Sequence, residues 1–487
     1  MTPFIGFAPD LEAQTPGVLT DCSHLIPYRN GMEAARDGST PTDVPALAAE
    51  CQGAAVVTAL DGTRRVIAGT ATNLYELVGG AWSDESRTVG GAYTGGVETR
   101  WSIAQFGDST VASNRADAMQ RSTGTTVNFA DISGAPKAEI VFTVGAFVMA
   151  LNVNDGTEKP DGWHCCAAYD ETDWTPSVTT QATKGRLVAS PGEFTAGMRL
   201  GEYAVAYKTD SLYLGQYVGS PAVWDWILVP GGGAGCVGKE AICDVDGAHF
   251  FVGQDNFWLF DGTRPVPVGD SQIRQWFFDN SDPQSLYKTK CCYDRQKNRV
   301  WIFYPSAGSS TCNSAIVYHL VSKQWGRSNR SIEACLNYVS SGTTYDTLSS
   351  VAATYDELSA IAYDSQFWLA GGRVMSVFNT SHQMQSYTGN PLASSLTTGD
   401  MGDDEVVSLF KQLRLRYAAG YGPTTATCTP YSKMSSGDSY TTGTTSSTND
   451  GKFDVLKSAR WHKATVSMTG LVRTTGIQPM LEFAGVR

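Results

Sequence analysis

The chain has 487 residues, of which 42% are hydrophobic and 17% charged, enough apolar material for a large buried core, and this composition excludes a disordered chain. Its formal net charge of −12 argues against a protein that binds DNA or anionic lipid through its overall field. The 50 Gly, 21 Tyr, 19 Phe and 12 Trp favour strands and tight turns over helices, so we expect an all-β fold.

The amino-terminal residues and the cysteines indicate the compartment in which such a chain is made. Residues 1–10 contain no basic stretch followed by an apolar one, so we do not expect a Sec signal. The longest uncharged apolar-rich stretch, residues 140–154, is too short for a spanning helix, and we interpret it as buried strand. An odd number of cysteines, 11, fits reduced thiols in a cytosol better than a disulfide framework.

Residues 1–50 contain six prolines and little periodic apolar pattern. Because proline interrupts regular pairing, this stretch predicts an extended amino-terminal arm, of the kind that attaches to neighbouring subunits. A flexible leader, or a strand that closes the next domain, would read the same way.

Residues 51–400 consist of short apolar runs separated by Gly, Asp and Asn. A tight two-residue hairpin turn needs positive φ at both central positions, so Asp-Gly and Asn-Gly pairs between apolar runs predict antiparallel hairpins. Such pairs begin at Asn30, Asp37, Asp61, Asp155, Asp161, Asp246, Asp261 and Asp450. We therefore expect meanders of consecutive strands.

The sequence also shows a longer repeat, in which an apolar strand is followed by Trp and a polar turn. The gaps between Trp82, Trp174, Trp226 and Trp325 are 92, 52 and 99 residues, near two, one and two multiples of one length. That length, roughly 50 residues, is typical of propeller blades. We predict an irregular β-propeller-like domain of about six or seven blades within residues 51–400. Chance spacing in a Trp-rich β protein is the alternative.

Two segments interrupt the strand pattern of the propeller region. Residues 270–279 predict one short capped helix. Residues 341–360 contain a tandem Thr-Tyr-Asp-x-Leu repeat, at 344–348 and 354–358, which we interpret as a loop insertion. Beyond residue 400, alternation at 413–417 and 464–468, on either side of a Ser/Thr/Gly-rich loop at 435–449, predicts a C-terminal β-sandwich or sheet domain over residues 401–487.

Several short motifs resemble reactive sites. Residues 233–238 match G-x-G-x-x-G, but no helix long enough to hold a pyrophosphate follows them. Ser109 follows Gly-Asp, as in GDS-type esterases, and Asp161 and His164 have the Asp-x-x-His spacing of such enzymes. The same Gly-Asp-Ser triplet is also a common turn, and it recurs at 269–271.

The remaining candidates have structural interpretations as well. The vicinal pairs Cys165-Cys166 and Cys291-Cys292 point to opposite faces of a strand and predict buried thiols rather than metal ligands. Carboxylate and amide runs at 152–156 and 244–247 lack the full ligand pattern of a calcium loop and predict hairpin turns. Trp and Tyr at strand spacing favour inter-blade core over sugar-stacking platforms. We accordingly assign no catalytic, cofactor-binding or metal-binding residue.

Three segments resemble the tail hub, nozzle and packaged-DNA-stabilising proteins of short-tailed bacteriophages, the podoviruses. They are residues 10–31, with a Pro-Gly pair at 16–17, the Thr-Tyr-Asp-x-Leu tandem, and the ending from 459 to 487. The resemblance implies a non-enzymatic, homo-oligomeric ring, commonly a hexamer, without a cofactor. Such a ring extends the tail below the portal and adaptor, retains packaged DNA and forms the conduit for its ejection.

The same resemblance implies a place and partners for the chain. It would reside in the virion tail after assembly in the host bacterial cytoplasm, contact the portal or adaptor and the tail fibre or spike proteins, and pass viral DNA without sequence-specific binding. A carbohydrate-binding or carbohydrate-degrading propeller, of the receptor-binding or depolymerase type, is the alternative function. An esterase using Ser109 and His164 is a third.

Overall fold

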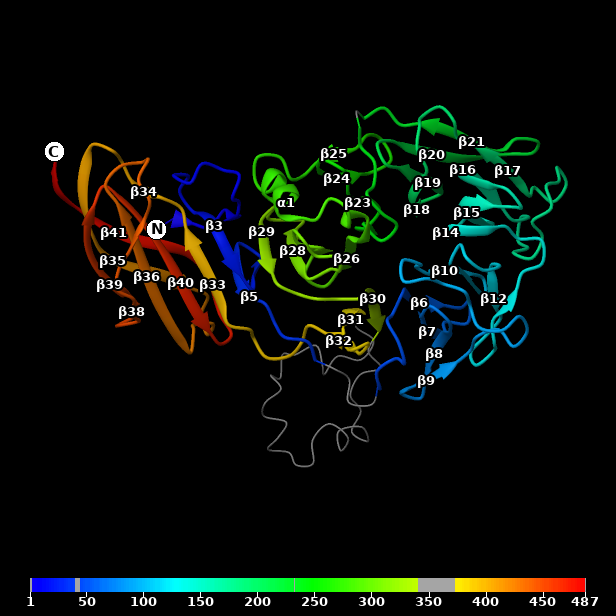
Figure 1. Ribbon diagram of the computed structural model, residues 1–487, viewed down its shortest axis with the longest axis horizontal. Helices are drawn as coiled ribbons and strands as arrows, with labels where there is room; N and C mark the ends of the chain where they lie inside the picture. Colours follow the sequence, from blue (N-terminus) through cyan, green and yellow to red (C-terminus); the bar gives the residue numbers. More distant parts are fainter. Residues whose placement is uncertain (1, 40–43, 232, 340–372, 487) are drawn as a thin grey trace.

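The computed structural model describes residues 2–39, 44–231, 233–339 and 373–486, and almost every element in them is a strand. Figure 1 shows two parts: sheets arranged around a centre, and a flatter pair of long-stranded sheets beside them. The fold is therefore all-β, an irregular β-propeller with an additional β-sandwich, as predicted. No helix within these described ranges is long and apolar enough to cross a membrane.

Six antiparallel meanders of four strands form the blades, and in each the strands pair in chain order. Five of them are separate four-stranded sheets, and the sixth is part of a ten-stranded sheet. Blades 1 to 3 consist of β6 (Ala54–Thr58), β7 (Arg64–Gly69), β8 (Leu74–Val78), β9 (Ala81–Asp84), β10 (Ser102–Phe106), β11 (Ser109–Ser113), β12 (Gln120–Ser122), β13 (Ala130–Asp131), β14 (Lys137–Val144), β15 (Phe147–Asn154), β16 (Glu158–Cys165) and β17 (Thr183–Arg186). Blades 4 to 6 consist of β18 (Phe194–Leu200), β19 (Tyr203–Lys208), β20 (Leu212–Gly219), β21 (Val223–Leu228), β22 (Ile242–Asp244), β23 (His249–Val252), β24 (Phe257–Phe260), β25 (Val266–Pro267), β26 (Lys290–Asp294), β27 (Arg299–Tyr304), β28 (Ser314–His319) and β29 (Trp325–Ser328).

A three-stranded sheet closes the ring between blades 6 and 1, and we call it the closing sheet. It consists of β30 (Ala334–Val339), β31 (Arg373–Phe378) and β32 (Met384–Ser386), and β30 packs against both β26 and β6. The first strands of the seven sheets begin at residues 54, 102, 137, 194, 242, 290 and 334 and face the centre. Their spacing confirms a repeat of roughly 50 residues. The Thr-Tyr-Asp-x-Leu tandem lies outside the described residues.

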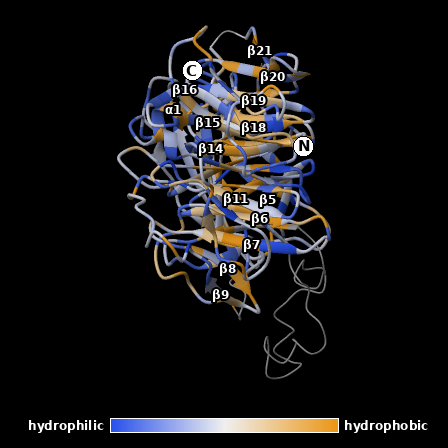
Figure 2. Cartoon of the chain, turned by 90° about the vertical axis from the view of Figure 1, so that its right-hand side faces the viewer, coloured by the Kyte–Doolittle hydropathy of each residue, from blue (hydrophilic) through white to orange (hydrophobic). Residues whose placement is uncertain are grey.

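The blades are held by apolar clusters that lie between neighbouring sheets rather than within one. Blades 3 and 4 share Phe147, Trp163 and Trp224, while Phe303 of blade 6 packs with Val377 of the closing sheet. A sheet cannot bury both faces alone, so each blade depends on its neighbours. Figure 2 shows hydrophobic residues concentrated along the strands and hydrophilic ones in many of the loops.

The turn chemistry follows the sequence prediction at some positions only. Asp246-Gly247 and Asp450-Gly451 have positive φ at both residues, as a tight hairpin turn requires. Asp161-Gly162 lies inside β16 instead of in a turn, and Asp161 forms an ion pair with Arg186 at 2.8 Å. The stretch 140–154, interpreted as one buried strand, is the hairpin of β14 and β15, which turns at Gly145.

The sandwich has two opposed sheets. One contains β1 (Thr2–Pro3), β41 (Arg473–Val486), β35 (Val406–Tyr417) and β39 (Phe453–Ala459), and it continues through β5 (Gly31–Ala34) and β4 (Leu25–Tyr28) into β29 of blade 6. The other contains β2 (Gly6–Phe7), β3 (Val18–Ser23), β33 (Ser394–Thr398), β34 (Met401–Gly402), β40 (Trp461–Thr469), β36 (Thr425–Lys433), β37 (Thr441–Thr442) and β38 (Ser446–Ser447).

The amino-terminal segment differs from the expected extended arm. Its strand β3 is an interior strand of the sandwich, between β2 and β33, and Leu19 and Cys22 are buried. Burial of these apolar side chains between two sheets favours the paired strand over an extended arm. The sandwich also begins before residue 401, since β33 starts at Ser394. The predicted alternation at 413–417 and 464–468 lies in β35 and β40, on opposite sheets.

The amino-terminal segment also caps α1 (Arg274–Asn280), the one α-helix among the described residues, which follows blade 5. This helix overlaps the short capped helix that the sequence predicts within residues 270–279. Both carboxylate oxygens of Asp10 accept backbone N–H groups of its first turn, from Gln275 at 2.6 Å and Trp276 at 2.9 Å. Phe7 packs edge-on against Trp276 at 4.8 Å. The short 3-10 helix η1 (Leu286–Lys288) precedes blade 6.

A buried charge cluster joins the two domains. Glu33 on β5 accepts hydrogen bonds from Arg299 of blade 6 at 2.7 Å and from its cross-strand partner Arg473 on β41 at 3.1 Å. Lys297 lies 3.8 Å away. Burial by itself would raise the pKa of Glu33, but the three cations outweigh it and lower that pKa to about 2.

We expect Glu33→Gln to destabilise the protein and to change its response to acid. A pKa lowered from 4.5 to about 2 gives stability that is complete above pH 4.5 and lost as the pH falls towards 2, worth about 3 kcal/mol. The wild-type melting temperature should therefore fall faster than that of the variant between pH 5 and pH 3. Glu482→Gln, which removes an exposed pair with Lys411, is the control and should shift melting little. Parallel pH profiles of wild type and Glu33→Gln would contradict this assignment.

Candidate functional site

The residues of the predicted esterase motif are held in different blades by separate partners. Ser109 begins β11 and accepts a hydrogen bond from Arg121 at 3.2 Å. His164 lies on β16, and its Nε2 contacts the carbonyl of Trp174 at 2.9 Å. Burial lowers the pKa of His164 to about 4. The structure does not pair this serine with this base, so the motif has no nucleophile–base geometry.

The glycines at 233–238 are explained by close packing of the backbone. A Cβ on Gly235 would lie 2.0 Å from the carbonyl oxygen of Thr209, and one on Gly238 would lie 1.9 Å from that of Tyr287. The segment then enters β22, a strand, instead of the helix that dinucleotide binding needs. It is therefore a tight connection between blades 4 and 5.

The cysteines behave as small core residues. All 11 are free thiols, and every one except the half-buried Cys335 is buried. Burial raises the pKa of both Cys165 and Cys166 to about 12, so neither is a thiolate at neutral pH. Within the described part of the chain, no three His, Cys, Asp or Glu residues come together as a metal site would require.

The candidate calcium turns use their carboxylates for contacts with protein groups. Asp155 accepts hydrogen bonds from Lys159 and Lys184, which lower its pKa to about 2. Asp246 pairs with Arg295 and accepts the hydroxyl of Tyr293 at 2.7 Å. In both turns the carboxylate is therefore already bonded to other side chains of the protein.

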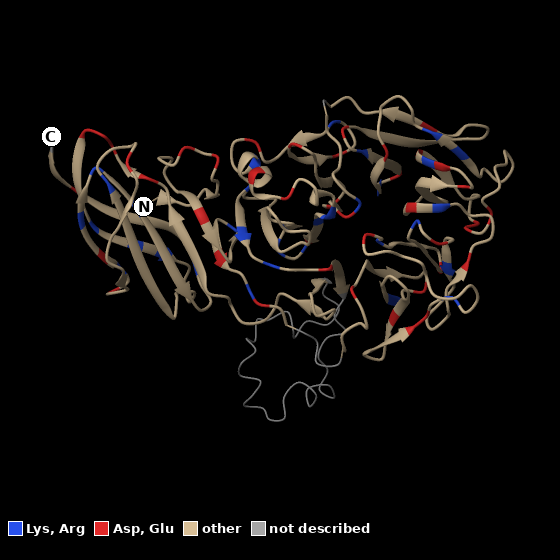
Figure 3. Ribbon diagram, in the orientation of Figure 1, with Lys and Arg blue, Asp and Glu red and all other residues tan. Residues whose placement is uncertain are grey.

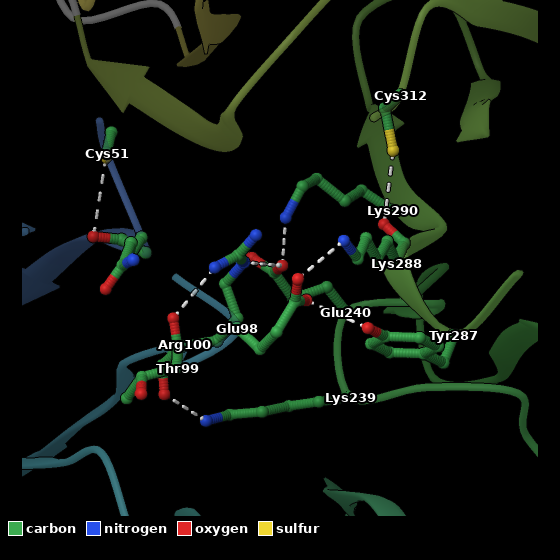
Figure 4. A network of polar contacts seen from close by, with 12 residues as sticks. Cys51, Glu98, Thr99, Arg100, Lys239, Glu240, Tyr287, Lys288, Lys290 and Cys312 are labelled. Carbon is green, nitrogen blue, oxygen red and sulfur yellow. Dashed lines mark hydrogen bonds and ion pairs between the residues drawn. The ribbon is translucent and has the colours of Figure 1, made fainter. Parts of the chain in front are cut away.

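A network at the centre of the propeller is the main polar site that sequence reasoning missed. Its residues stand immediately before, or at the beginning of, the first strands of different sheets, so the ring brings them to one end of the axis. Figure 3 shows Lys/Arg and Asp/Glu near one another at this centre, and Figure 4 shows the contacts. We call it the axial cluster: Glu50, Glu98, Arg100, Glu139, Lys239, Glu240, Lys288, Lys290 and Glu333.

Glu240 is the central carboxylate of the axial cluster. It forms an ion pair with Lys290, whose side chain is only 3% exposed, and lies 4.0 Å from Arg100. Burial disfavours the Lys290 ammonium, but Glu240 outweighs that effect and the pKa of Lys290 is raised. Arg100 also lies 3.5 Å from Glu50, and so links blade 2 to blade 1. Lys290 is thus charged at neutral pH.

Further pairs extend the cluster around the axis. Lys239 donates to the carbonyl of Arg100 at 2.7 Å and lies 3.6 Å from Glu139 of β14. Glu98 accepts from Lys288 at 2.9 Å and from the Tyr287 hydroxyl at 2.8 Å, and these bonds lower its pKa.

Glu333 connects the axial cluster to the closing sheet. Glu333 accepts the backbone N–H of Cys51 at 2.9 Å and contacts His382 at 2.7 Å. Burial raises the pKa of Glu333.

The axial cluster is therefore a network of ion pairs. Its four cations each have a carboxylate partner, so none is left to receive a substrate anion. An opening of about 260 Å³ beside it is lined by the same paired residues. The arrangement cross-links the blades at one end of the axis. The available signal was a charged residue close to the start of several apolar first strands.

A larger hollow lies at the opposite ends of the first strands, between blades 3 and 4. Its volume is about 770 Å³, and it is bordered by the β14–β15 turn at Gly145, the β18–β19 turn at Glu202, and the loop containing Tyr169. We call it the tyrosine groove. It is the widest of the concave sites described for the chain. Sequence reasoning did not single it out because two separate blades form it.

No protein-family model matches the chain, and no curated protein matches it. Among solved structures, BamB from Moraxella catarrhalis aligns with a TM-score of 0.38 and 9% identity, over 75% of this chain and 96% of that one. YCF48 from Cyanidioschyzon merolae aligns with a TM-score of 0.36 and 12% identity, over 73% and 97%. PorZ from Porphyromonas gingivalis gives 0.32 and 12%, over 58% and 37%. Likenesses this low carry no argument about function.

We expect Lys290→Met to lower the thermal stability of the protein strongly, because it leaves the Glu240 carboxylate partly buried without its nearest cation. Removing one partner of a buried pair costs about 3–5 kcal/mol. Lys411→Met, which removes the exposed pair with Glu482, is the matched control and should cost about 0–1 kcal/mol. Differential scanning calorimetry of the two variants gives the comparison, and equal destabilisation would contradict a structural role for the axial cluster.

Proposed function

We propose that the chain is a non-enzymatic structural subunit of a short-tailed phage virion, a tail hub or nozzle protein that assembles into a ring. In this role the ring extends the tail below the portal and adaptor, retains packaged DNA and forms the conduit for its ejection. The proposal joins the resemblance of residues 10–31 and 459–487 to one structural observation, an open sheet edge on the sandwich. The net charge of −12 suits a conduit that must release DNA.

The open edge is the outer half of β41. Residues 478–485 pair with β35 on one side, and on the other side they meet no strand within the described residues, since β1 and β5 pair only with positions 473–477. Met480, Leu481 and Phe483 on this half-strand are 47%, 37% and 71% exposed. Unpaired backbone together with exposed apolar side chains is the surface on which another chain adds a strand.

The other edge of the same sheet has features that discourage such pairing. On β39, Leu456 has a positive φ of 52°, which distorts the strand, and Lys457 beside it is exposed. Bulges and lysines are the usual protection of edge strands. Because one edge is protected and the other is not, we assign the β41 edge to a second copy of the chain. A ring needs a heterologous contact, in which this edge meets a different surface of the next subunit.

We expect the purified protein to form closed rings in negative-stain images and a matching mass by mass photometry, and to attach to tail-deficient phage particles. Phe483→Asp should shift the distribution to monomers, because a carboxylate would be buried at the contact. Leu60→Asp, at a residue that is 80% exposed on the β6–β7 turn, is the control and should leave the rings intact. A wild-type protein that stays monomeric and does not associate with tails would overturn the proposal.

The alternative function, a carbohydrate-binding or carbohydrate-degrading propeller, has one specific observation in its favour. The tyrosine groove presents aromatic rings to solvent, as sugar-binding surfaces do. The charge of that groove distinguishes the two readings, and its test follows below.

A further inference from the structure

The tyrosine groove combines a rigid aromatic floor with exposed rings at its rim. Phe147 and Trp224 are 3% and 5% exposed and lie 5.6 Å apart in an edge-to-face arrangement. Tyr217, which is 46% exposed, packs against Phe147 at 5.5 Å. Tyr169 and Tyr203, on separate loops, are 84% and 38% exposed. Ring faces are thus available to a ligand on a floor that cannot easily rearrange.

The groove is also acidic, and Arg121, which lies outside its lining, is the only cation that contributes to the lowered pKa of Asp170. Its lining includes Asp170, Asp173 and Glu202 but neither Lys nor Arg. Asp170 accepts the N–H and hydroxyl of Thr172, and these bonds lower its pKa, so it is ionised at neutral pH. Asp173 accepts one backbone N–H, and Glu202 at the turn is exposed. In the axial cluster, by contrast, each cation has a carboxylate partner.

We propose that the tyrosine groove binds the guanidinium group of an arginine in an extended peptide segment of a partner protein. A guanidinium stacks on tyrosine faces, is weakly hydrated, and donates to carboxylates in a planar fork, so it satisfies both features at once. A neutral sugar would use the rings but would not neutralise the carboxylates of the lining. A volume of about 770 Å³ accommodates several residues of peptide. This inference goes beyond ring formation and does not depend on it.

The test is isothermal titration of the full-length protein with a short capped peptide of alternating glycine and arginine. The matched control peptide carries citrulline, which has the shape of arginine without its charge. We expect the arginine peptide to bind, to bind more weakly as salt increases, and to exceed the citrulline peptide by at least about tenfold in affinity. Equal binding of the two peptides would overturn the proposal, as would an absence of arginine-peptide binding.

Variants locate the binding in the groove. Glu202→Gln and Tyr203→Ala should each weaken binding of the arginine peptide by about tenfold, and Tyr203→Phe, which keeps the ring, should bind like wild type. Glu193→Gln removes an exposed carboxylate outside the groove and should also bind like wild type. Wild-type affinity in both Glu202→Gln and Tyr203→Ala would place the binding elsewhere and overturn the assignment.

A neutral oligosaccharide such as cellohexaose is titrated in parallel. Its binding in place of the arginine peptide would overturn the proposal and support the carbohydrate alternative. Ring formation by the groove variants is measured by mass photometry, and it should match wild type because the groove and the β41 edge lie in different domains. Failure of this inference is therefore distinguishable from failure of the proposed ring.

Discussion

The propeller and the sandwich are joined through one buried carboxylate, that of Glu33, whose charge is neutralised by three cations. Glu33 lies on a short hairpin whose one strand pairs with blade 6 and whose other strand pairs with β41 of the sandwich. Arg473 lies between the rings of Tyr28 and Tyr421, at 4.2 and 3.8 Å, which fixes its direction towards Glu33. Because an isolated buried charge is costly, the blade, the hairpin and the carboxy-terminal strand must all be in place together.

Like this charge cluster, the apolar core is shared by the two domains. One continuous cluster of buried side chains includes Phe250 and Ile302 of the propeller and Phe410 and Val466 of the sandwich. Domains joined by a small polar interface usually move relative to each other, but a shared core together with a shared sheet opposes such movement. The shared core and the shared sheet therefore oppose movement of one part relative to the other.

Local features of this fold could be predicted from the sequence, and long-range ones could not. Strand alternation, the repeat of about 50 residues and the short helix near 274 are local patterns, and the structure reproduces them. The partner of β3 is β33, more than three hundred residues away, and nothing in the local pattern encodes it. Arg65 and Glu76 form a buried pair at 2.9 Å against blade 2, and no local pattern in the sequence encodes their pairing. The tyrosine groove could not be predicted from the sequence either, because Tyr169 and Tyr203 come to line one groove only when two blades pack together.

The sandwich is built from both ends of the chain, and the propeller is inserted between them. Strands β3 to β5 are synthesised first, but their partners β33 and β41 begin only at residues 394 and 473. At 5–20 residues per second, roughly 20 to 70 seconds of translation separate β5 from β33. During that interval β3 lacks its partner β33, whereas β4 can pair with β29 as soon as blade 6 has been synthesised. The blades can meanwhile fold one after another. All strands of the propeller are therefore synthesised before the sandwich can close.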